Sequence, residues 1–253
     1  MKKWIAMLLA MLMLVPAACA EGRYEGEGFD SAEAAVQAYV EAFNAGDVQA
    51  MLSTFAIETY VERTDRLASI GRMTIFSTNN YDTYPMPNDY MRQLLIADRV
   101  GGLARYMTGQ YMMYIWPEEG YGRYDDGAPL PLRGDEEASA FLSAFDDAAA
   151  SDWTGKIAFN GFARLEDLDS GLKEIMTRES TLKNISLLVA GRGCDEMANL
   201  IASLTVDGKD GFLFMECSRY GDRWYNTSLG GILATVVGMN PSYAGLGIAG
   251  GMD

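Results

Sequence analysis

The segment LTVDGKDGFLFMECSRYGDRWYN, residues 204–226, decides the fold class of this chain, because it predicts two consecutive β-hairpins. Apolar and polar residues alternate on both sides of Gly-containing turns, a pattern typical of strands that bury one face. A one-residue slip would move every side chain to the other face, so the pattern favours one register. With Gly208-Lys209 as the first turn, the apolar face pairs Val206 with Gly211, Leu204 with Leu213, Ala202 with Met215 and Leu200 with Cys217. The second hairpin turns at Gly221-Asp222 and places Trp224 beside Arg219 on the same face.

The residues before these hairpins are mostly helical in pattern. Asp30 is expected to cap a helix that ends at residue 45, and Gly46-Asp47 ends it and caps a second helix over 48–55. The remaining expected elements are helices at 57–70, 89–115 (with an interruption at Gly101-Gly102), 136–149 and 180–190, a strand at 156–165, and a helix or helical turn at 229–239. This order predicts an α+β fold.

Residues 1–20 are expected to be a signal peptide. Lys2 and Lys3 precede an apolar run over residues 4–15, and Ala18-Cys19-Ala20 fits an A-x-A cleavage pattern before Glu21. The apolar run is shorter than the roughly 20 residues that a membrane-spanning helix needs, so no membrane span is expected. The segment predicts a secreted or extracytoplasmic protein, with lipid anchoring through Cys19 as the alternative. Residues 21–253 then form a single domain.

Composition excludes several classes of function. The chain carries 20 Lys and Arg against 35 Asp and Glu, a net charge of −15, so nucleic acid is not an expected partner. No histidine occurs, which excludes Ser-His-Asp and Cys-His catalysis and every His-based metal site. The match GLGIAG at 245–250 lacks the strand and helix that a dinucleotide site requires, and we interpret 240–253 as a Gly-rich tail. No cofactor and no metal site are expected.

Cys194 and Cys217 are expected to be free thiols. In the register above, Leu200 lies opposite Cys217, and Cys194 precedes Leu200 by six residues. In an extended chain the two sulfurs would lie about 20 Å apart, whereas a disulfide needs Cα atoms within about 7 Å.

Two segments resemble one protein family. SAEAAVQAYVEAFNAGDVQAMLSTFA, residues 31–56, resembles the opening helix pair of nuclear-transport-factor-two-like (SnoaL-like) proteins, and YGDRWY, residues 220–225, is similar to their long final strands. The resemblance implies a secreted bacterial member whose curved antiparallel sheet packs on the N-terminal helices as a cone. It also implies a pocket at the open end of the cone and a helical insertion over residues 76–150.

The residues expected to line that pocket are Tyr39, Phe43, Phe214, Glu216, Tyr220 and Trp224. Glu216 is also the candidate catalytic residue, because a carboxyl group on a partly apolar strand face can act as an acid or base. The alternative is that this face is the solvated outer side of the sheet.

The leading function is non-catalytic binding of a small molecule, peptide or envelope component in the cone-shaped pocket. The alternatives are a carboxylate and tyrosine acid–base enzyme (an isomerase, lyase or hydrolase) and a protein-interaction module without a ligand pocket. The partner is an unknown small molecule or protein, and a homodimer is left open.

Overall fold

The computed structural model describes residues 22–72, 85–115, 157–165, 170–239 and 244–248, with the single positions 136 and 139. The expected signal peptide, Cys19, residues 76–84 and 116–135 of the expected helical insertion, and nearly all of the expected helix at 136–149 lie outside the described residues. The described helices are α2 (Ala32–Ala45), α3 (Val48–Ser53), α4 (Glu58–Arg63), α5 (Arg66–Arg72), α6 (Asp89–Ile115), α10 (Ser170–Thr177), α11 (Glu179–Arg192) and α12 (Gly231–Val236). The described strands are β1 (Ile157–Phe162), β2 (Glu196–Val206), β3 (Lys209–Tyr220), β4 (Arg223–Leu229) and β5 (Leu246–Ile248).

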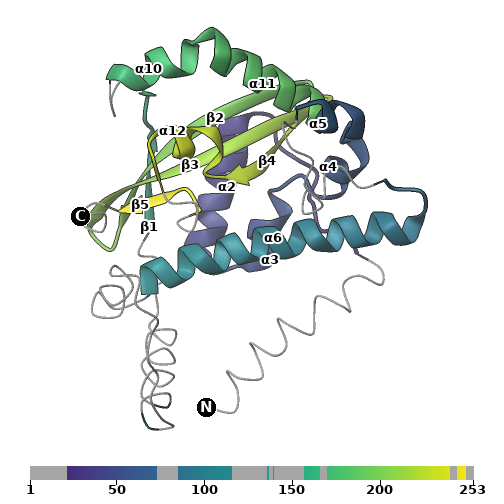
Figure 1. Ribbon diagram of the computed structural model, residues 1–253. Helices are drawn as coiled ribbons and strands as arrows, with labels where there is room; N and C mark the ends of the chain where they lie inside the picture. Colours follow the sequence, from purple (N-terminus) through teal and green to yellow (C-terminus); the bar gives the residue numbers. More distant parts are fainter. Residues whose placement is uncertain are drawn as a thin grey trace.

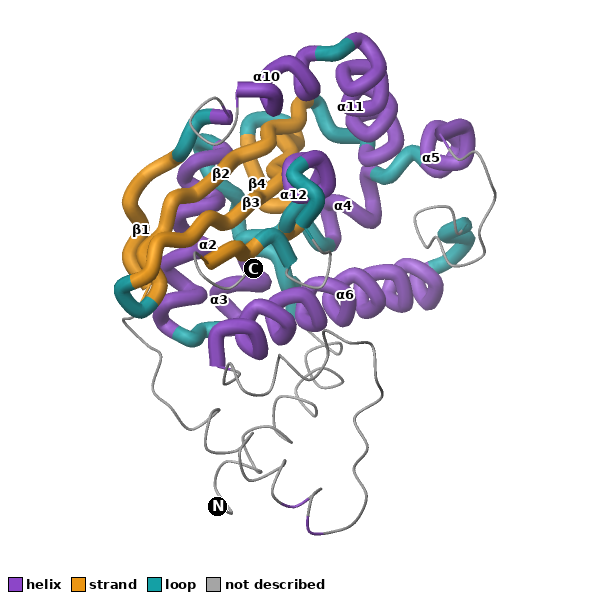
Figure 2. Tube along the Cα trace, turned by 60° about the vertical axis from the view of Figure 1, so that its left-hand side comes forward, coloured by secondary structure: helices purple, strands orange, loops and turns teal. Residues whose placement is uncertain are grey.

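The protein is α+β, with an open antiparallel sheet in the order β1-β2-β3-β4 and β5 paired to β3 (Figure 1). Helix α2 packs against one face, which we call the inner face, and α12 packs against the other, the outer face (Figure 2). Leu204 and Met215 on the inner face join the main core with α2, whereas Ile201 and Phe214 on the outer face cluster with Leu233 of α12. Both faces of the sheet are therefore covered at its centre.

The register of the first hairpin differs from the prediction by two residues. Val206 pairs with Lys209, Leu204 with Gly211 and Ala202 with Leu213, around a turn at Asp207-Gly208. Both turn residues have positive φ, 49° and 78°, as a type I′ turn requires, and Asp-Gly is a preferred sequence for that turn. A shift of two preserves the side-chain alternation, so the predicted inner face is confirmed although the pairing was wrong. The second hairpin is confirmed, with Arg219 opposite Trp224.

The start of α2 also differs from the prediction. Ser31, and not Asp30, is the N-cap, and its side chain accepts a hydrogen bond from the amide of Ala34. Asp30 instead forms an ion pair with Arg223 of β4. The break at Gly46-Asp47 is confirmed: Gly46 has φ 69°, and the side chain of Asp47 accepts a hydrogen bond from the amide of Ala50 to cap α3.

Helix α6 runs through Gly101 and Gly102 without the expected interruption. Each glycine in a helix costs about 1 kcal/mol relative to alanine. The cost is offset because buried side chains continue at helical spacing on both sides of the pair, at Ile96, Val100, Leu103 and Met107. In the part of the chain that is described, no helix combines the length and the apolar character that crossing a membrane requires.

The remaining expectations were partly correct. The helical segment at 57–70 is two helices, α4 and α5, and the helix at 180–190 is α11. The C-terminal segment is not only a tail, because Leu246–Ile248 form β5 beside β3. Leu246 is fully buried in the main core, and this apolar contact holds the strand in place.

Candidate functional site

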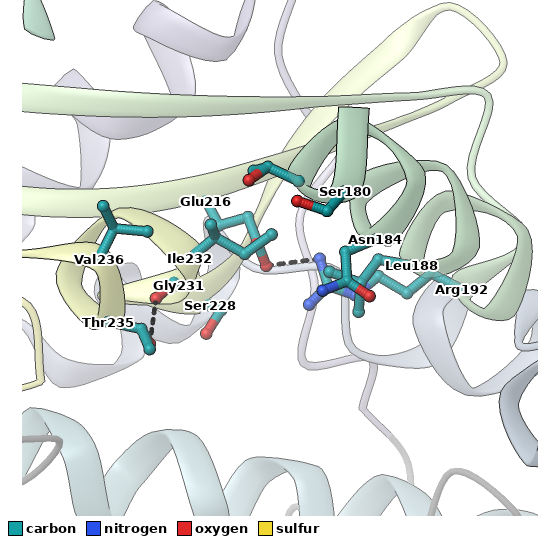
Figure 3. Close-up of a pocket in the computed structure, with 11 residues that line it drawn as sticks. Ser180, Asn184, Leu188, Arg192, Glu216, Ser228, Gly231, Ile232, Thr235 and Val236 are labelled. Atoms are coloured by element: carbon teal, nitrogen blue, oxygen red, sulfur yellow. Dashed lines mark hydrogen bonds and ion pairs between the residues drawn. The ribbon is translucent and has the colours of Figure 1, made fainter. Parts of the chain in front are cut away.

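A pocket of about 420 Å³ opens on the outer face, between α11, α12 and strands β3 and β4 (Figure 3). Its size lies within the range of about 300–1,000 Å³ that is usual for small-molecule sites. Its lining is Ser180, Thr181, Asn184, Leu188 and Arg192 from α11, Glu216 from β3, Ser228 from β4, and Gly231, Ile232, Thr235 and Val236 around α12.

One stripe of α11 forms a wall of the pocket. Ser180, Asn184, Leu188 and Arg192 follow each other at intervals of four residues, so they lie on one side of the helix. Helix α11 ends at Gly193, whose φ is 60° and where an added Cβ would lie 1.9 Å from the carbonyl oxygen of Arg63. Only glycine fits there, and it fixes the end of the helix next to Arg192.

The floor of the pocket holds a buried ion pair. Arg192 Nη1 lies 2.5 Å from Glu216 Oε1, and the side chains are 14% and 1% exposed (Figure 3). Arg192 Nη1 also donates to the sulfur of Met197 on β2, at 3.2 Å. The guanidinium therefore lies across β2 and β3. The carboxylate of Glu216 is close to Gly231, where an added Cβ would be 2.9 Å from the Cβ of Glu216.

Burial and the neighbouring charge act in opposite directions on Arg192. Burial is the largest single influence and alone would lower the pKa of its guanidinium, but the negative charge of Glu216, the hydrogen bond to Glu216 and the nearby Tyr60 and Tyr220 together raise the pKa above the ordinary value. Arg192 is therefore a fixed positive charge inside the pocket. Tyr220 Oη donates to the carbonyl oxygen of Arg192 at 3.5 Å. Burial raises the pKa of Tyr220 above its ordinary value, which keeps this donor protonated.

Two buried acceptors lie next to each other on this face. Asn199 on β2 pairs directly with Glu216 on β3, so the two side chains point to the same side of the sheet. Both oxygens, Asn199 Oδ1 and Glu216 Oε1, are buried. Glu216 Oε1 is paired with Arg192 Nη1, whereas Asn199 Oδ1 accepts no hydrogen bond from any described residue. Buried acceptors without donors are costly and are uncommon in folded proteins.

Three of the four hydroxyl groups in the described pocket lining donate hydrogen bonds to the backbone. Thr181 Oγ1 donates to the carbonyl oxygen of Ile175 at 2.8 Å, and Thr235 Oγ1 donates to that of Gly231 at 3.1 Å. Ser228 Oγ makes a longer bond, 3.4 Å, to the carbonyl oxygen of Leu229. None of these three hydroxyls donates to a carboxylate, which is the arrangement that activates a nucleophile.

Of the six residues expected to line one pocket, only Glu216 lines this one. Tyr39 and Phe43 are buried on the inner side, where Tyr39 Oη donates to Gln110 Oε1 at 2.6 Å. Trp224 lies at the edge of the same core. Phe214 packs with α12, and Tyr220 packs with Tyr60, so the six residues belong to separate clusters. The space between α2 and the sheet contains fully buried Tyr39, Phe43, Phe55 and Met51.

Glu216 does not lie on a solvated outer face, which was the alternative interpretation. It is 1% exposed, because α11 and α12 cover this part of the sheet. The polar stripe of α11 was missed from the sequence. The signal for this stripe is the four-residue spacing of Ser180, Asn184, Leu188 and Arg192, which predicts that they share one side of a helix. The spacing does not show which part of the protein that side of the helix packs against.

Cys194 and Cys217 are free and buried, as expected from the sequence. The two cysteines stay too far apart for a disulfide in the observed register, because Cys217 pairs with Ala198, four residues beyond Cys194. Burial raises the pKa of both thiols, most strongly that of Cys217, whose sulfur lies 3.3 Å from Asn226 Oδ1.

We expect a thiol reagent at pH 8 to react slowly with folded protein spanning residues 21–253, and to titrate both thiols when the protein is unfolded without reductant. The thiolate is the reactive form, so each unit by which the pKa rises slows the reaction about tenfold, and burial adds to this. A count of zero in the unfolded protein would show a disulfide and contradict the prediction.

The chain was also compared with known proteins. No protein-family model matches the sequence, and no curated protein matches it. Among solved structures, it is similar to a cystatin-like protein from Ruminococcus gnavus ATCC 29149, at 9% identity and a TM-score of 0.38. The match covers 77% of this chain and 39% of that chain. A likeness at this level carries no argument about function, which therefore rests on the site.

Proposed function

We propose that this protein is a non-catalytic binding protein that holds a small molecule or a short peptide in the pocket between α11, α12 and the sheet. The observation that carries the proposal is the buried Arg192–Glu216 pair at the floor of an open pocket. Fixed polar groups at the base of a cavity with apolar walls are typical of ligand sites. Leu188, Ile232 and Val236 supply the apolar part of this wall.

The hydrogen bonds of the pocket favour binding over catalysis. A serine or threonine nucleophile needs a base within hydrogen-bond distance, and Thr181, Ser228 and Thr235 donate to backbone carbonyl groups instead. An acid–base enzyme (an isomerase, lyase or hydrolase) that uses Glu216 is the second candidate, since this carboxylate lines the pocket. Its Oε1 faces the guanidinium of Arg192, which would have to move before that oxygen could take a proton.

Two further parts of the proposal rest on the sequence. The pattern of residues 1–20 supports export, with lipid anchoring through Cys19 as the alternative. The helix pair and the final hairpin support a nuclear-transport-factor-two-like architecture, with a cone-shaped sheet and a helical insertion, and the antiparallel sheet packed on α2 is compatible with it. The proposed ligand site differs from that of the family, because it lies on the opposite face of the sheet from α2.

The first experiment is native mass spectrometry of gently purified protein spanning residues 21–253, followed by a thermal-shift screen of small metabolites. Two adjacent leucines of α11 provide a matched pair of variants. Leu188 lines the pocket, whereas Leu187 is 37% exposed and does not line it. We expect Leu188→Trp to remove the retained mass or the thermal shift, because the indole fills the cavity, and Leu187→Trp to preserve it.

Equal effects of the two variants would place the ligand elsewhere. Turnover of a bound compound that is lost in Glu216→Gln would favour the enzyme instead. A bare mass together with no stabilising compound would contradict the binding function.

A further inference from the structure

We infer that the ligand of this pocket is an aliphatic carboxylate, whose carboxylate group binds Nε and Nη2 of Arg192 and whose apolar part lies between α11 and α12. The inference rests on the proposed binding function and names the chemical class of its ligand. Two sources share this chemistry, a free aliphatic acid and the C-terminus of a short peptide that ends in an aliphatic residue. The inference follows from the donors of Arg192, the charge at the pocket floor and the aliphatic walls.

Arg192 carries donors that no described residue accepts. Its Nη1 lies 2.5 Å from Glu216 Oε1 and 3.2 Å from the sulfur of Met197. Nε and Nη2 have no partner in the described part of the chain, and neither is one of the buried polar atoms that lack a hydrogen bond. The side chain is 14% exposed and lines the pocket, so these two nitrogens face the open space.

A carboxylate fits these two nitrogens better than a neutral acceptor does. The N–H groups on one edge of a planar guanidinium bind both oxygens of one carboxylate through parallel hydrogen bonds. Hydrogen bonds between ionised groups are also about twice as strong as those between neutral groups. Binding leaves the pair with Glu216 in place, because Glu216 contacts Nη1. The guanidinium of Arg192 then lies between two carboxylates, one from the protein and one from the ligand.

The charge of the surroundings limits the ligand to one negative charge. Arg192 and Glu216 sum to zero, and the described lining contains no other charged residue. The chain as a whole has a net charge of −15, which repels anions at long range. A phosphate monoester would bring about 1.5 to 2 negative charges at pH 7, whereas a carboxylate brings one. A monocarboxylate is therefore favoured over a phosphorylated ligand.

The walls favour an aliphatic body for the ligand. Leu188 lies one helical turn before Arg192 on α11, and Ile232 and Val236 lie on the other side of the pocket, on α12 (Figure 3). The described lining holds no aromatic residue on which the face of a sugar ring could stack. The volume of about 420 Å³ lies toward the lower end of small-molecule sites, which suits a ligand of medium size.

The test of the carboxylate is isothermal titration calorimetry at pH 7 with protein spanning residues 21–253. The probes are hexanoate, octanoate and an acetylated tripeptide that ends in leucine, each beside its neutral amide. We expect each carboxylate to bind at least about tenfold more tightly than its amide, because the amide loses the charged hydrogen bonds to Arg192. Equal affinities of acid and amide would overturn the inference.

A charged variant of the pocket wall tests the same point from the protein side. Leu188→Glu places a carboxylate four residues before Arg192, the helical spacing at which such pairs form, so it competes with the ligand for the same donors. Leu188→Gln has the same length without the charge. We expect Leu188→Glu to bind octanoate at least about tenfold more weakly than Leu188→Gln does.

Leu187→Glu is the control for the added charge, because Leu187 is exposed and does not line the pocket. It should keep the affinity of the unmodified protein. Equal affinities of Leu188→Glu and Leu188→Gln for octanoate would overturn the inference, since a site that recognises a carboxylate must respond to that charge.

Asn184 distinguishes the two sources of the carboxylate. It lies two turns before Arg192 on the same side of α11, about 12 Å along the helix axis. Its side chain is exposed, and an amide group can both donate to and accept from a peptide group. Three residues of extended peptide span about 10 Å, so a peptide bound through its C-terminus reaches Asn184. A free aliphatic acid has no group to bond there.

Asn184→Ala then assigns the source. For a peptide C-terminus, the acetylated tripeptide binds more tightly than octanoate and loses about tenfold in affinity in this variant. For a free acid, octanoate binds more tightly and the variant leaves its affinity unchanged. Either result supports recognition of a carboxylate at Arg192.

The outcomes separate this inference from the binding function itself. If a neutral compound binds and Leu188→Trp blocks it, while no carboxylate binds more tightly than its amide, the pocket is a binding site and the carboxylate is wrong. If no compound binds at about 10 mM and no mass is retained, both proposals fail.

Discussion

Phe43→Ala is expected to lower the free energy of unfolding by about 3–5 kcal/mol, the usual cost of removing a buried aromatic side chain. Phe43 is 1% exposed and lies in the main core between α2 and the inner face of the sheet. Its ring stacks on Tyr39, with centroids 6.1 Å apart and an interplanar angle of 14°. Urea unfolding followed by circular dichroism would measure the loss.

Phe162→Ala is the matched control, because Phe162 lies on β1 and is 36% exposed. It should cost about 1 kcal/mol, mainly through its edge contact with Phe159. The milder Phe43→Leu should leave ligand affinity unchanged, since Phe43 lies on the opposite side of the sheet from the pocket. A loss for Phe43→Ala no larger than that of the control, or a change in affinity for Phe43→Leu, would contradict this placement of Phe43.

Arg192→Ala is expected to be about as destabilising, by roughly 3–5 kcal/mol at pH 7. The substitution leaves the carboxylate of Glu216 buried, at 1% exposure, without its positive partner. The cost is mainly that of an uncompensated charge, so the double variant Arg192→Ala, Glu216→Gln should be more stable than Arg192→Ala alone. The measurement is a double-mutant cycle by urea unfolding.

An exposed ion pair beside the same helix provides the comparison. Arg178 and Glu174 lie 3.2 Å apart, with side chains 55% and 76% exposed. Arg178→Ala should cost less than about 1 kcal/mol, because solvent screens such a pair. If Arg192→Ala cost no more than Arg178→Ala, the Arg192–Glu216 pair would not be a buried interaction in solution.

Local patterns in the sequence were sufficient for most elements. The pair α2 and α3 follows from apolar spacing and from Gly46-Asp47, and the inner face of the first hairpin follows from strict alternation. These properties depend on residues that are close in the chain, because steric preference, helix capping and strand alternation all act over short sequence distances. The type I′ preference of Asp207-Gly208 was also in the sequence, and it corrects the pairing by two residues.

The sequence around a residue did not decide whether that residue lies in the core or lines the pocket. Tyr39 and Phe43 are aromatic residues of the kind that line ligand pockets, yet on α2 they face the inner side of the sheet, where they are buried. Glu216 has the sequence context of either a solvated or a catalytic carboxylate, and only the covering helices decide that it is buried and paired. Burial depends on which distant segments pack together, and alternation alone does not contain that information.

The sequence by itself therefore determined the α+β class, the hairpins, the helix boundaries near Gly46 and the two free thiols, because short-range sterics and hydrogen bonding govern them. Only the tertiary structure placed Arg192 of α11 against Glu216 of β3, beside Asn199 of β2. Arg192 and Glu216 come from different elements, and a long-range contact forms through the packing of α11 and α12 on the sheet. The candidate site exists because of that packing.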